Sequence, residues 1–281
     1  MRIGISGFRI PPNERYTKLR SFGFDCYDFG MEDIYAFPAG EEFDEYLRKE
    51  KEYADKAGIT IWQVHGPWVF PPRDETIENR EERLESMKRS IHGAAVLGVK
   101  YWVVHPIMPF GIQDTLIDKV KETRALNLEF MKKLLSFAKS EGVIICLENM
   151  PFTQFSLSSP SDIADFVREM NDPSFAMCLD TGHANVSSDY DTPANSLRKY
   201  GEYIKVLHVH DNFGIIDNHL APFEGTIDWK DFSAALKETG FDGVLSLECA
   251  PDKSLQSDMF ENKYREYCEI ARSILSGNIK A

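Results

Sequence analysis

Eight short runs rich in β-branched and other apolar residues alternate with longer segments of helical periodicity. The runs cover residues 2–6, 24–28, 59–65, 100–105, 143–148, 175–179, 203–210 and 243–249. Between them, residues 114–140 carry apolar side chains at helical spacing, from Leu116 to Ala138. This alternation is typical of a parallel sheet whose strands are connected by helices.

A glycine closes four of the helical segments just before the next apolar run. These residues are Gly58, Gly98, Gly142 and Gly240. Glycine tolerates the left-handed backbone conformation that often ends a helix, so its recurrence indicates one repeated strand–helix unit. Eight such units in 281 residues agree with the roughly 250 residues typical of a (β/α)8, or TIM, barrel.

The main alternative is a doubly wound open sheet, which normally carries a G-x-G-x-x-G phosphate loop after its first strand. The first run ends in Gly4-Ile5-Ser6-Gly7, which lacks that pattern. No linker or low-complexity segment interrupts the series of units. We therefore predict a single-domain (β/α)8 barrel over residues 1–281.

The composition limits the compartment and the kind of partner. No apolar stretch reaches the roughly 20 residues that cross a bilayer, and residues 1–6 have a strand pattern instead of a signal-sequence pattern. These features predict a cytoplasmic protein without a membrane partner. The five cysteines show no CxxC spacing, and Cys146, Cys178 and Cys249 lie in or beside apolar runs, as buried reduced thiols do. The net charge of −13 disfavours a partner bound mainly through its phosphates.

Six consecutive runs, from the third to the eighth, end in a side chain that can bind a metal ion. In a closed barrel these ends lie on one rim, where active sites are found. The side chains are His65, His105, Glu148, Asp180 followed by His183, His208 followed by His210, and Glu248. One polar residue at a strand end is often only solvated, but all the histidines except His92 lie at or just after such ends. The convergence of histidines and carboxylates predicts a divalent-metal site.

The alternation of side chains along the last two runs supports this prediction. Because alternate strand residues share a face, Ile204, Val206, His208 and His210 are expected to point the same way. Both histidines can then face the barrel axis, one as a metal ligand and the other as a substrate contact. Glu248 is expected at the mouth of the barrel for the same reason.

Three phrases give the sequence a family resemblance. They are Asp180-Thr181-Gly182-His183, His208-Val209-His210-Asp211-Asn212 and Asp217-Asn218-His219-Leu220, with residues 223–229 following the last. Together with the strand-end residues from His65 to Glu248, they resemble the xylose-isomerase-like barrel superfamily. That superfamily comprises sugar isomerases and epimerases and also contains endonuclease IV.

The resemblance implies a set of metal ligands. The sugar epimerases of the family hold their metal with a glutamate, an aspartate, a histidine and a glutamate after strands five to eight. These positions carry over to Glu148, Asp180, His208 and Glu248. His208 is preferred to His210 because the family's histidine ligand is followed three positions later by an acidic residue, here Asp211. In the endonuclease branch, further zinc ions use positions that match His65, His105, His183, Asp217 and His219, so the number of metal ions stays open.

The first functional hypothesis is a metal-dependent sugar or sugar phosphate isomerase or epimerase. A divalent ion such as Mn, Co, Mg or Zn would act as a Lewis acid and stabilise an enediolate, while Glu148 and Glu248 transfer the protons. His183 is expected to bind a substrate hydroxyl, and Trp68 and Phe70 are expected to wall the pocket. The sequence does not decide which sugar is bound, whether it is phosphorylated, or whether the chain forms a homo-oligomer, as relatives commonly do.

The second hypothesis is a zinc-dependent endonuclease that acts on abasic DNA, since its full ligand set is present. Against it, the loop of residues 29–35 contains no basic residue, and only scattered candidates such as Arg9 and Arg73 are available to hold phosphates. The phrase Gly4-Ile5-Ser6-Gly7 also departs from the usual first strand of that enzyme. The sugar enzyme is therefore favoured over a nucleic-acid enzyme. A third possibility, a barrel that binds sugar or metal for regulation, is less attractive because of the paired glutamates.

Overall fold

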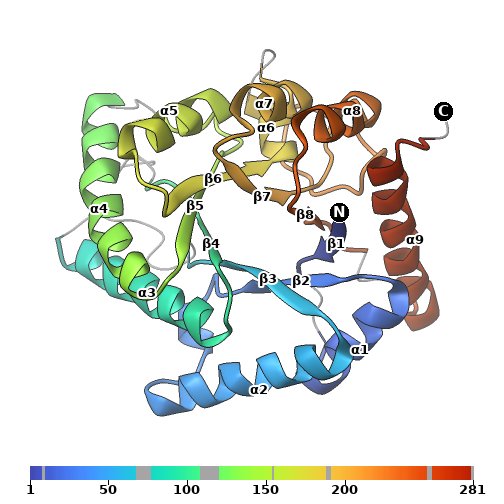
Figure 1. Cartoon of the computed structure of the whole chain (residues 1–281), viewed down its shortest axis with the longest axis horizontal. Helices are drawn as coiled ribbons and strands as arrows, with labels where there is room; N and C mark the ends of the chain where they lie inside the picture. The colour runs from blue at the N-terminus through green and yellow to red at the C-terminus, as the bar shows by residue number, and fades with distance from the viewer. Residues whose placement is uncertain are drawn as a thin grey trace.

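Eight parallel strands pair in the order β7-β6-β5-β4-β3-β2-β1-β8 in the computed structural model. The strands are β1 Arg2–Ile5, β2 Cys26–Gly30, β3 Thr60–His65, β4 Tyr101–Val104, β5 Ile144–Glu148, β6 Phe175–Asp180, β7 Ile204–His208 and β8 Val244–Leu247. A parallel bridge between Val209 and Leu247 joins the two edges, where Glu248 N donates to Val209 O over 2.9 Å. The sheet therefore closes into a barrel, which confirms the predicted (β/α)8 fold (Figure 1).

A ring of helices surrounds this barrel (Figure 1). The helices are α1 Pro12–Phe22, the short 3-10 helix η1 Ile34–Ala36, α2 Glu41–Ala57, α3 Ile77–Val96, α4 Val120–Ser140, α5 Pro160–Met170, α6 Thr181–Ser187, α7 Pro193–Tyr200, α8 Trp229–Thr239 and α9 Ser257–Ser276. The structure describes residues 1–7, 10–67, 77–107, 120–153, 155–187, 191–251 and 255–279. Of the helix predicted over 114–140, residues 120–140 form α4, and residues 114–119 lie outside the described ranges.

The glycines predicted to end helices have the expected backbone conformation. Gly58, Gly98, Gly142 and Gly240 all have φ between 65° and 71°. Other helices begin with side-chain caps. Ser159 and Asp162 form a reciprocal capping box at the start of α5, and the Asp228 side chain accepts from Asp231 N at the start of α8. Local chemistry therefore fixes where the repeated unit turns from helix to strand and back.

The second strand lies further along the chain than predicted. The apolar run predicts residues 24–28, but β2 covers Cys26–Gly30. Phe24 N donates to Leu19 O over 3.2 Å, so Phe24 belongs to the turn after α1. At the other end, Met31 N donates to His65 O over 2.9 Å, and the pairing with β3 continues past Gly30. Hydrogen bonding to the neighbouring strand sets these bounds, and the hydrophobicity of the sequence does not reveal that pairing.

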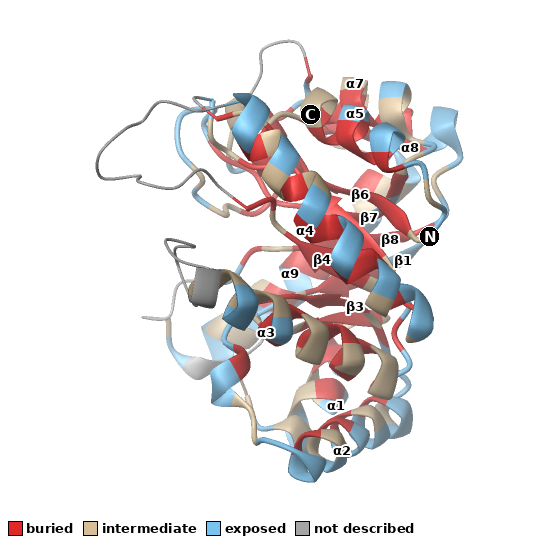
Figure 2. Ribbon diagram, turned by 90° about the vertical axis from the view of Figure 1, so that its left-hand side faces the viewer, coloured by how far each residue is buried: buried red, intermediate tan, exposed pale blue. Residues whose placement is uncertain are grey.

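Apolar side chains pack in two layers. The buried side chains of the inner layer come from β4 to β7, and partly buried Trp62 of β3 packs against them. They are Val103, Cys146, Ala176, Cys178 and Val206. The outer layer lies between the strands and the helices, and Figure 2 shows buried strands beneath helices whose outer faces are exposed. Val206 faces inward as predicted. Ile204 instead packs in the outer layer, because the register between β6 and β7 shifts at this point.

All five cysteines are buried and free, as predicted for three of them. Burial raises the pKa of Cys146, Cys178 and Cys249, which keeps these thiols protonated and unreactive. Within the described ranges, no helix combines the length and apolarity that a bilayer span requires.

Candidate active site

The predicted ligands converge on one rim of the barrel. His65, Glu148, Asp180 and His208 are the last residues of β3, β5, β6 and β7, and His105 and Glu248 directly follow β4 and β8. His183 lies in α6, while His210, Asp217 and His219 lie between β7 and α8. Residues Trp68 and Phe70, predicted to wall the pocket, lie outside the described residues.

Four of these residues form what we call the inner group: Glu148, Asp180, His208 and Glu248. Each offers one ligand atom, and the four atoms lie within 4.8 Å of one another. His208 Nδ1 is 3.0 Å from Glu148 Oε1 and 2.9 Å from Glu248 Oε2. Glu148 and Asp180 are fully buried, whereas Glu248 keeps a quarter of its side chain exposed (25%). The inner group is the set that the family resemblance implies for the epimerase metal.

The outer group consists of His183, His210, Asp217 and His219, and its ligand atoms also lie within 4.8 Å of one another. Asp217 Oδ2 is 3.1 Å from His183 Nε2 and 3.0 Å from His219 Nε2. The rings of His210 and His219 stack with centroids 4.2 Å apart. The two histidines of β7 and its extension are thus divided, with His208 in the inner group and His210 in the outer one.

A pair of histidines forms a third set of ligand atoms, close to the second carboxylate oxygen of Glu148, Oε2. His65 Nε2 and His105 Nε2 lie 3.4 Å and 3.3 Å from Glu148 Oε2. His210 Nε2 lies 3.0 Å from Asp180 Oδ1, which connects the outer group to the inner one. Glu148 and Asp180 are therefore shared between neighbouring sets of ligand atoms.

Residues that the sequence analysis did not single out hold these ligands in place. Asn149 Oδ1 accepts from Asp180 N over 2.9 Å, and Asn149 O accepts from His183 Nδ1 over 2.8 Å. Thr181 Oγ1 donates to His210 O over 2.7 Å. Thr181 lies in a phrase that carries the family resemblance and Asn149 directly follows Glu148, but only the tertiary contacts reveal their roles.

Charge balance dominates the electrostatics of both groups. Burial alone would raise the pKa of Glu148, but His208 and His105 hold it well below its usual value. Burial would lower the pKa of His183, but the Asp180, Asp217 and Glu148 carboxylates raise it to about 10. In the same way, the pKa of His219 rises to about 9 beside Asp217 and Glu248. Positive charge therefore stabilises the buried carboxylates, and either protons on the histidines or a metal ion can supply it.

The donor chemistry fits a divalent metal ion. Glu148 Oε2, Glu248 Oε2 and Asp217 Oδ1 are buried, and among the described residues they have histidine nitrogens nearby but no hydrogen bond of good geometry. Buried carboxylate oxygens are normally satisfied, so these atoms are available to a cation. A mixed set of imidazole and carboxylate donors can hold Mn, Co, Mg or Zn, and it does not select one of them.

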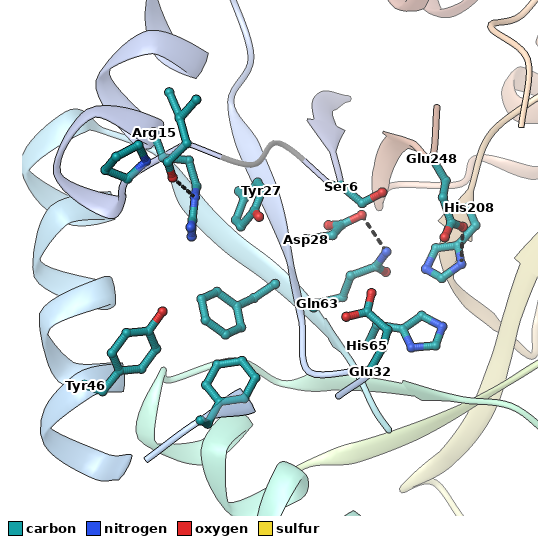
Figure 3. Close-up of a pocket in the computed structure, with 16 residues that line it drawn as sticks. Ser6, Arg15, Tyr27, Asp28, Glu32, Tyr46, Gln63, His65, His208 and Glu248 are labelled. Carbon is teal, nitrogen blue, oxygen red and sulfur yellow. Dashed lines mark hydrogen bonds and ion pairs between the residues drawn. The ribbon is translucent and has the colours of Figure 1, made fainter. Parts of the chain in front are cut away.

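A cavity of about 410 Å³ opens beside the inner group. His65, His208 and Glu248 lie on its wall, followed by Asp28, Gln63 and Glu32 further from the metal ligands (Figure 3). Its far end carries Arg15 and several aromatic rings. Among the described residues, Glu248 lines the cavity and Glu148 does not.

Curated relatives of the chain include sugar-converting enzymes and nucleases. D-psicose 3-epimerase of Ruminiclostridium cellulolyticum is 25% identical over 82% of this chain and 75% of its own length. Probable endonuclease 4 of Mycoplasmopsis agalactiae is 25% identical over 72% of each chain. An uncharacterised protein of Methanocaldococcus jannaschii is 28% identical over 96% of this chain and 90% of its own.

Solved structures and a family model agree on the fold. D-psicose 3-epimerase from Clostridium cellulolyticum H10, solved with D-tagatose, has a TM-score of 0.80 at 18% identity over 98% of this chain and 99% of its own. The IOLI protein with a bound zinc atom has a TM-score of 0.75 at 18% identity and covers both chains fully (100%). The model of the xylose isomerase-like TIM barrel matches residues 16–272. The chain therefore belongs to the xylose isomerase-like TIM barrel family.

Proposed function

We propose that this protein is a divalent-metal-dependent sugar isomerase or epimerase. The inner group carries the proposal, since two glutamates, an aspartate and a histidine bring their ligand atoms within 4.8 Å of one another beside a cavity. The relatives named as sugar epimerases support the same reading.

Glu148, Asp180, His208 and Glu248 would hold the metal. When bound there, a divalent ion supplies Lewis-acid polarisation of a carbonyl and its neighbouring hydroxyl oxygen. The protein supplies a closed set of donors on four neighbouring strands, which fixes the donor positions before the substrate arrives.

We assign proton transfer to Glu148 and Glu248. Glu248 faces the cavity, and its pKa stays low because His208 outweighs the effect of burial, so it enters the reaction as a base. It removes the proton from the carbon next to the carbonyl, and Glu148, after taking a proton from the imidazolium of His65 3.4 Å away, acts as the partner acid. Return of the proton to the opposite face of the same carbon gives an epimer, and its transfer to the neighbouring carbon gives an isomer. His183 would bind a substrate hydroxyl through Nε2 in this scheme, in place of its contact with Asp217.

The test is metal content by elemental analysis, combined with an epimerisation assay on ketoses after Mn or Co addition. We expect about one exchangeable ion per inner group, and we expect Glu148→Gln and Glu248→Gln each to lower kcat by roughly a hundredfold or more. Glu141→Gln is the matched control, because Glu141, directly after α4, pairs with His92 on α3. Unchanged turnover in either active-site variant would exclude the proton-transfer role of that glutamate.

A second function is favoured by one further observation, the outer group and the His65–His105 pair beside the inner group. The family resemblance matches His65, His105, His183, Asp217 and His219 to the additional zinc ligands of the endonuclease branch. A protein named probable endonuclease 4 is among the similar proteins. Against a nuclease, the cavity wall carries Asp28, Glu32 and Glu248. Two or three tightly held zinc ions, cleavage of abasic DNA and no sugar turnover would establish this second function instead.

A further inference from the structure

Asp28 and Gln63 form a polar pair inside the barrel that the proposed proton transfers do not use. Asp28 on β2 and Gln63 on β3 are paired in register, and they are 4% and 1% exposed. Gln63 Nε2 donates to Asp28 Oδ2 over 2.7 Å, and Ser246 Oγ on β8 donates to the same oxygen. Both Asp28 and Gln63 line the cavity that His208 and Glu248 also line (Figure 3).

Each member of the pair retains one unused acceptor. Asp28 Oδ1 and Gln63 Oε1 are buried and have no hydrogen-bond partner in the part of the chain that the structure describes. An unsatisfied buried acceptor destabilises a fold, because the lost hydration is not replaced. Burial also raises the pKa of Asp28 to about 6, so a neutral side chain would suit this position better if only packing were required. Two such acceptors side by side are therefore better explained by a ligand that supplies donors.

The surroundings define the chemistry of that ligand. Glu32 and Glu248 lie on the same wall as Asp28, so an anionic group would meet several carboxylates. Arg15, the cation among the described residues at the far end, contacts Glu50 at 3.2 Å and donates to Ile10 O over 3.3 Å. A phosphate offers acceptors and negative charge, whereas a neutral polyol offers hydroxyl donors. The wall therefore fits hydroxyl groups and opposes a phosphate.

The far end of the cavity offers an apolar surface as well. Phe29 and Phe37 have ring centroids 6.1 Å apart, and Phe37 and Tyr46 have centroids 5.7 Å apart. In Figure 3, Asp28 and Gln63 lie between Tyr46 on one side and His208 and Glu248 on the other. A ligand that reaches from the inner group past the polar pair would place its carbon-bound hydrogens against these rings.

We propose that Asp28 and Gln63 are a specificity subsite that accepts hydrogen bonds from hydroxyl groups at the non-reacting end of a neutral, unphosphorylated polyhydroxy substrate. This inference rests on the proposed sugar isomerase or epimerase function, and it adds the substrate class and two residues that select it. Ser246 is a positioning residue, because its hydroxyl holds the Asp28 oxygen that does not face the ligand.

The test uses the cobalt-loaded protein with D-fructose, D-psicose, D-tagatose and D-sorbose, and with the 6-phosphates of D-fructose and D-tagatose. Dissociation constants come from calorimetry, and turnover comes from chromatographic analysis of the products. We expect a free ketose to bind at least roughly tenfold more tightly than its phosphate. Asp28→Asn and Gln63→Met should each weaken binding of that ketose by roughly tenfold to a hundredfold, with a larger effect on KM than on kcat.

Two controls separate recognition from folding. Asp55→Asn changes an exposed carboxylate of α2 and should leave binding unchanged. A monodeoxy ketose that lacks the recognised hydroxyl should bind the wild type and the Asp28→Asn variant equally well, which a merely structural role would not produce. Metal content should be the same in every variant.

The outcomes distinguish the two proposals. Tighter binding of a ketose phosphate, or unchanged dissociation constants in both variants while ketoses are still converted, would overturn the subsite and leave the proposed function intact. Failure of the wild type to bind or convert any of these sugars would overturn both.

Discussion

Gly182 illustrates how one residue can decide the shape of the candidate site. It is the second residue of α6, and a β-carbon added there would overlap the ring of His210. His210 is fully buried, contacts Asp180 and stacks on His219, so its ring has little room to move. The glycine of the Asp180-Thr181-Gly182-His183 phrase is thus required for close approach between α6 and the segment after β7.

Gly182→Ala should therefore act against the usual trend for helices. In an ordinary helix position, alanine is about 1 kcal/mol more favourable than glycine. Here we expect a loss of about 1–3 kcal/mol in the free energy of unfolding and weaker metal retention, because the His210 ring must shift. Urea denaturation and elemental analysis measure the two effects. In a His210→Ala background the same substitution should be nearly harmless, and an equal loss in both backgrounds would contradict the overlap.

At the scale of an element, the shape of the connection between β7 and α8 likewise depends on one residue. This connection, residues 209–228, carries His210, Asp217 and His219 and is organised around the buried carboxylate of Asp211. Asp211 Oδ2 accepts from Trp229 Nε1 over 2.7 Å and from Phe223 N over 3.1 Å. Asp211 also pairs with Leu220 through two backbone hydrogen bonds of 2.8 Å and 2.9 Å.

Asp211→Asn should loosen this connection, because an amide places a donor group where Asp211 now only accepts. Hydrogen bonds to a charged group contribute about 1.5–3 kcal/mol each, so we expect a loss of a few kcal/mol in stability. Retention of metal by the outer group should fall more than retention by the inner group. Thermal unfolding and metal stoichiometry provide the measurements, with Asp242→Asn on the exposed loop before β8 as the control. Equal metal loss from both groups would show that Asp211 supports the whole rim instead.

At the scale of the whole molecule, the candidate metal site joins strands that are far apart in the sequence. The inner group takes one ligand from the end of each of β5, β6, β7 and β8. An ion that binds only the folded chain stabilises it by mass action, by about 2.7 kcal/mol at a hundredfold excess over its dissociation constant. Protons compete for the same buried nitrogen and oxygen atoms.

This competition predicts how stability depends on pH. The pKa values of His183 and His219 are raised to about 10 and about 9 from an ordinary value of 6.5, so the folded chain holds these protons more tightly than the unfolded chain. Without metal, their contribution to stability is complete below pH 6.5 and is lost as pH rises through these two values. Stabilisation by cobalt should grow over the same range, because fewer protons must be displaced.

Urea denaturation at about pH 6.5 and about pH 9.5, with and without cobalt, measures this dependence. The His219→Gln variant should lose less stability than the wild type as pH rises in the absence of metal. Parallel curves for the two proteins would mean that His219 does not carry the raised pKa in the folded chain.

The sequence alone determined the class of fold and the composition of the rim. Strand periodicity and the glycines that end helices are local properties, and a barrel brings the carboxyl ends of its strands together whatever their separation along the chain. Ligand types at consecutive strand ends therefore predicted a rim of histidines and carboxylates. The register shift between β6 and β7 that turns Ile204 outward could not be seen, because it depends on pairing with a neighbouring strand.

The family resemblance already preferred His208 as the inner ligand, but only the tertiary structure placed His210 in a second group with His183, Asp217 and His219. It also revealed Asp28 and Gln63, which sit within ordinary strand patterns and become notable only through burial and unpaired acceptors. Distances between side chains from different strands decide which atoms can share one ion or one substrate. A linear pattern does not contain those distances, because they arise from the closure of the barrel and the packing of the helices around it.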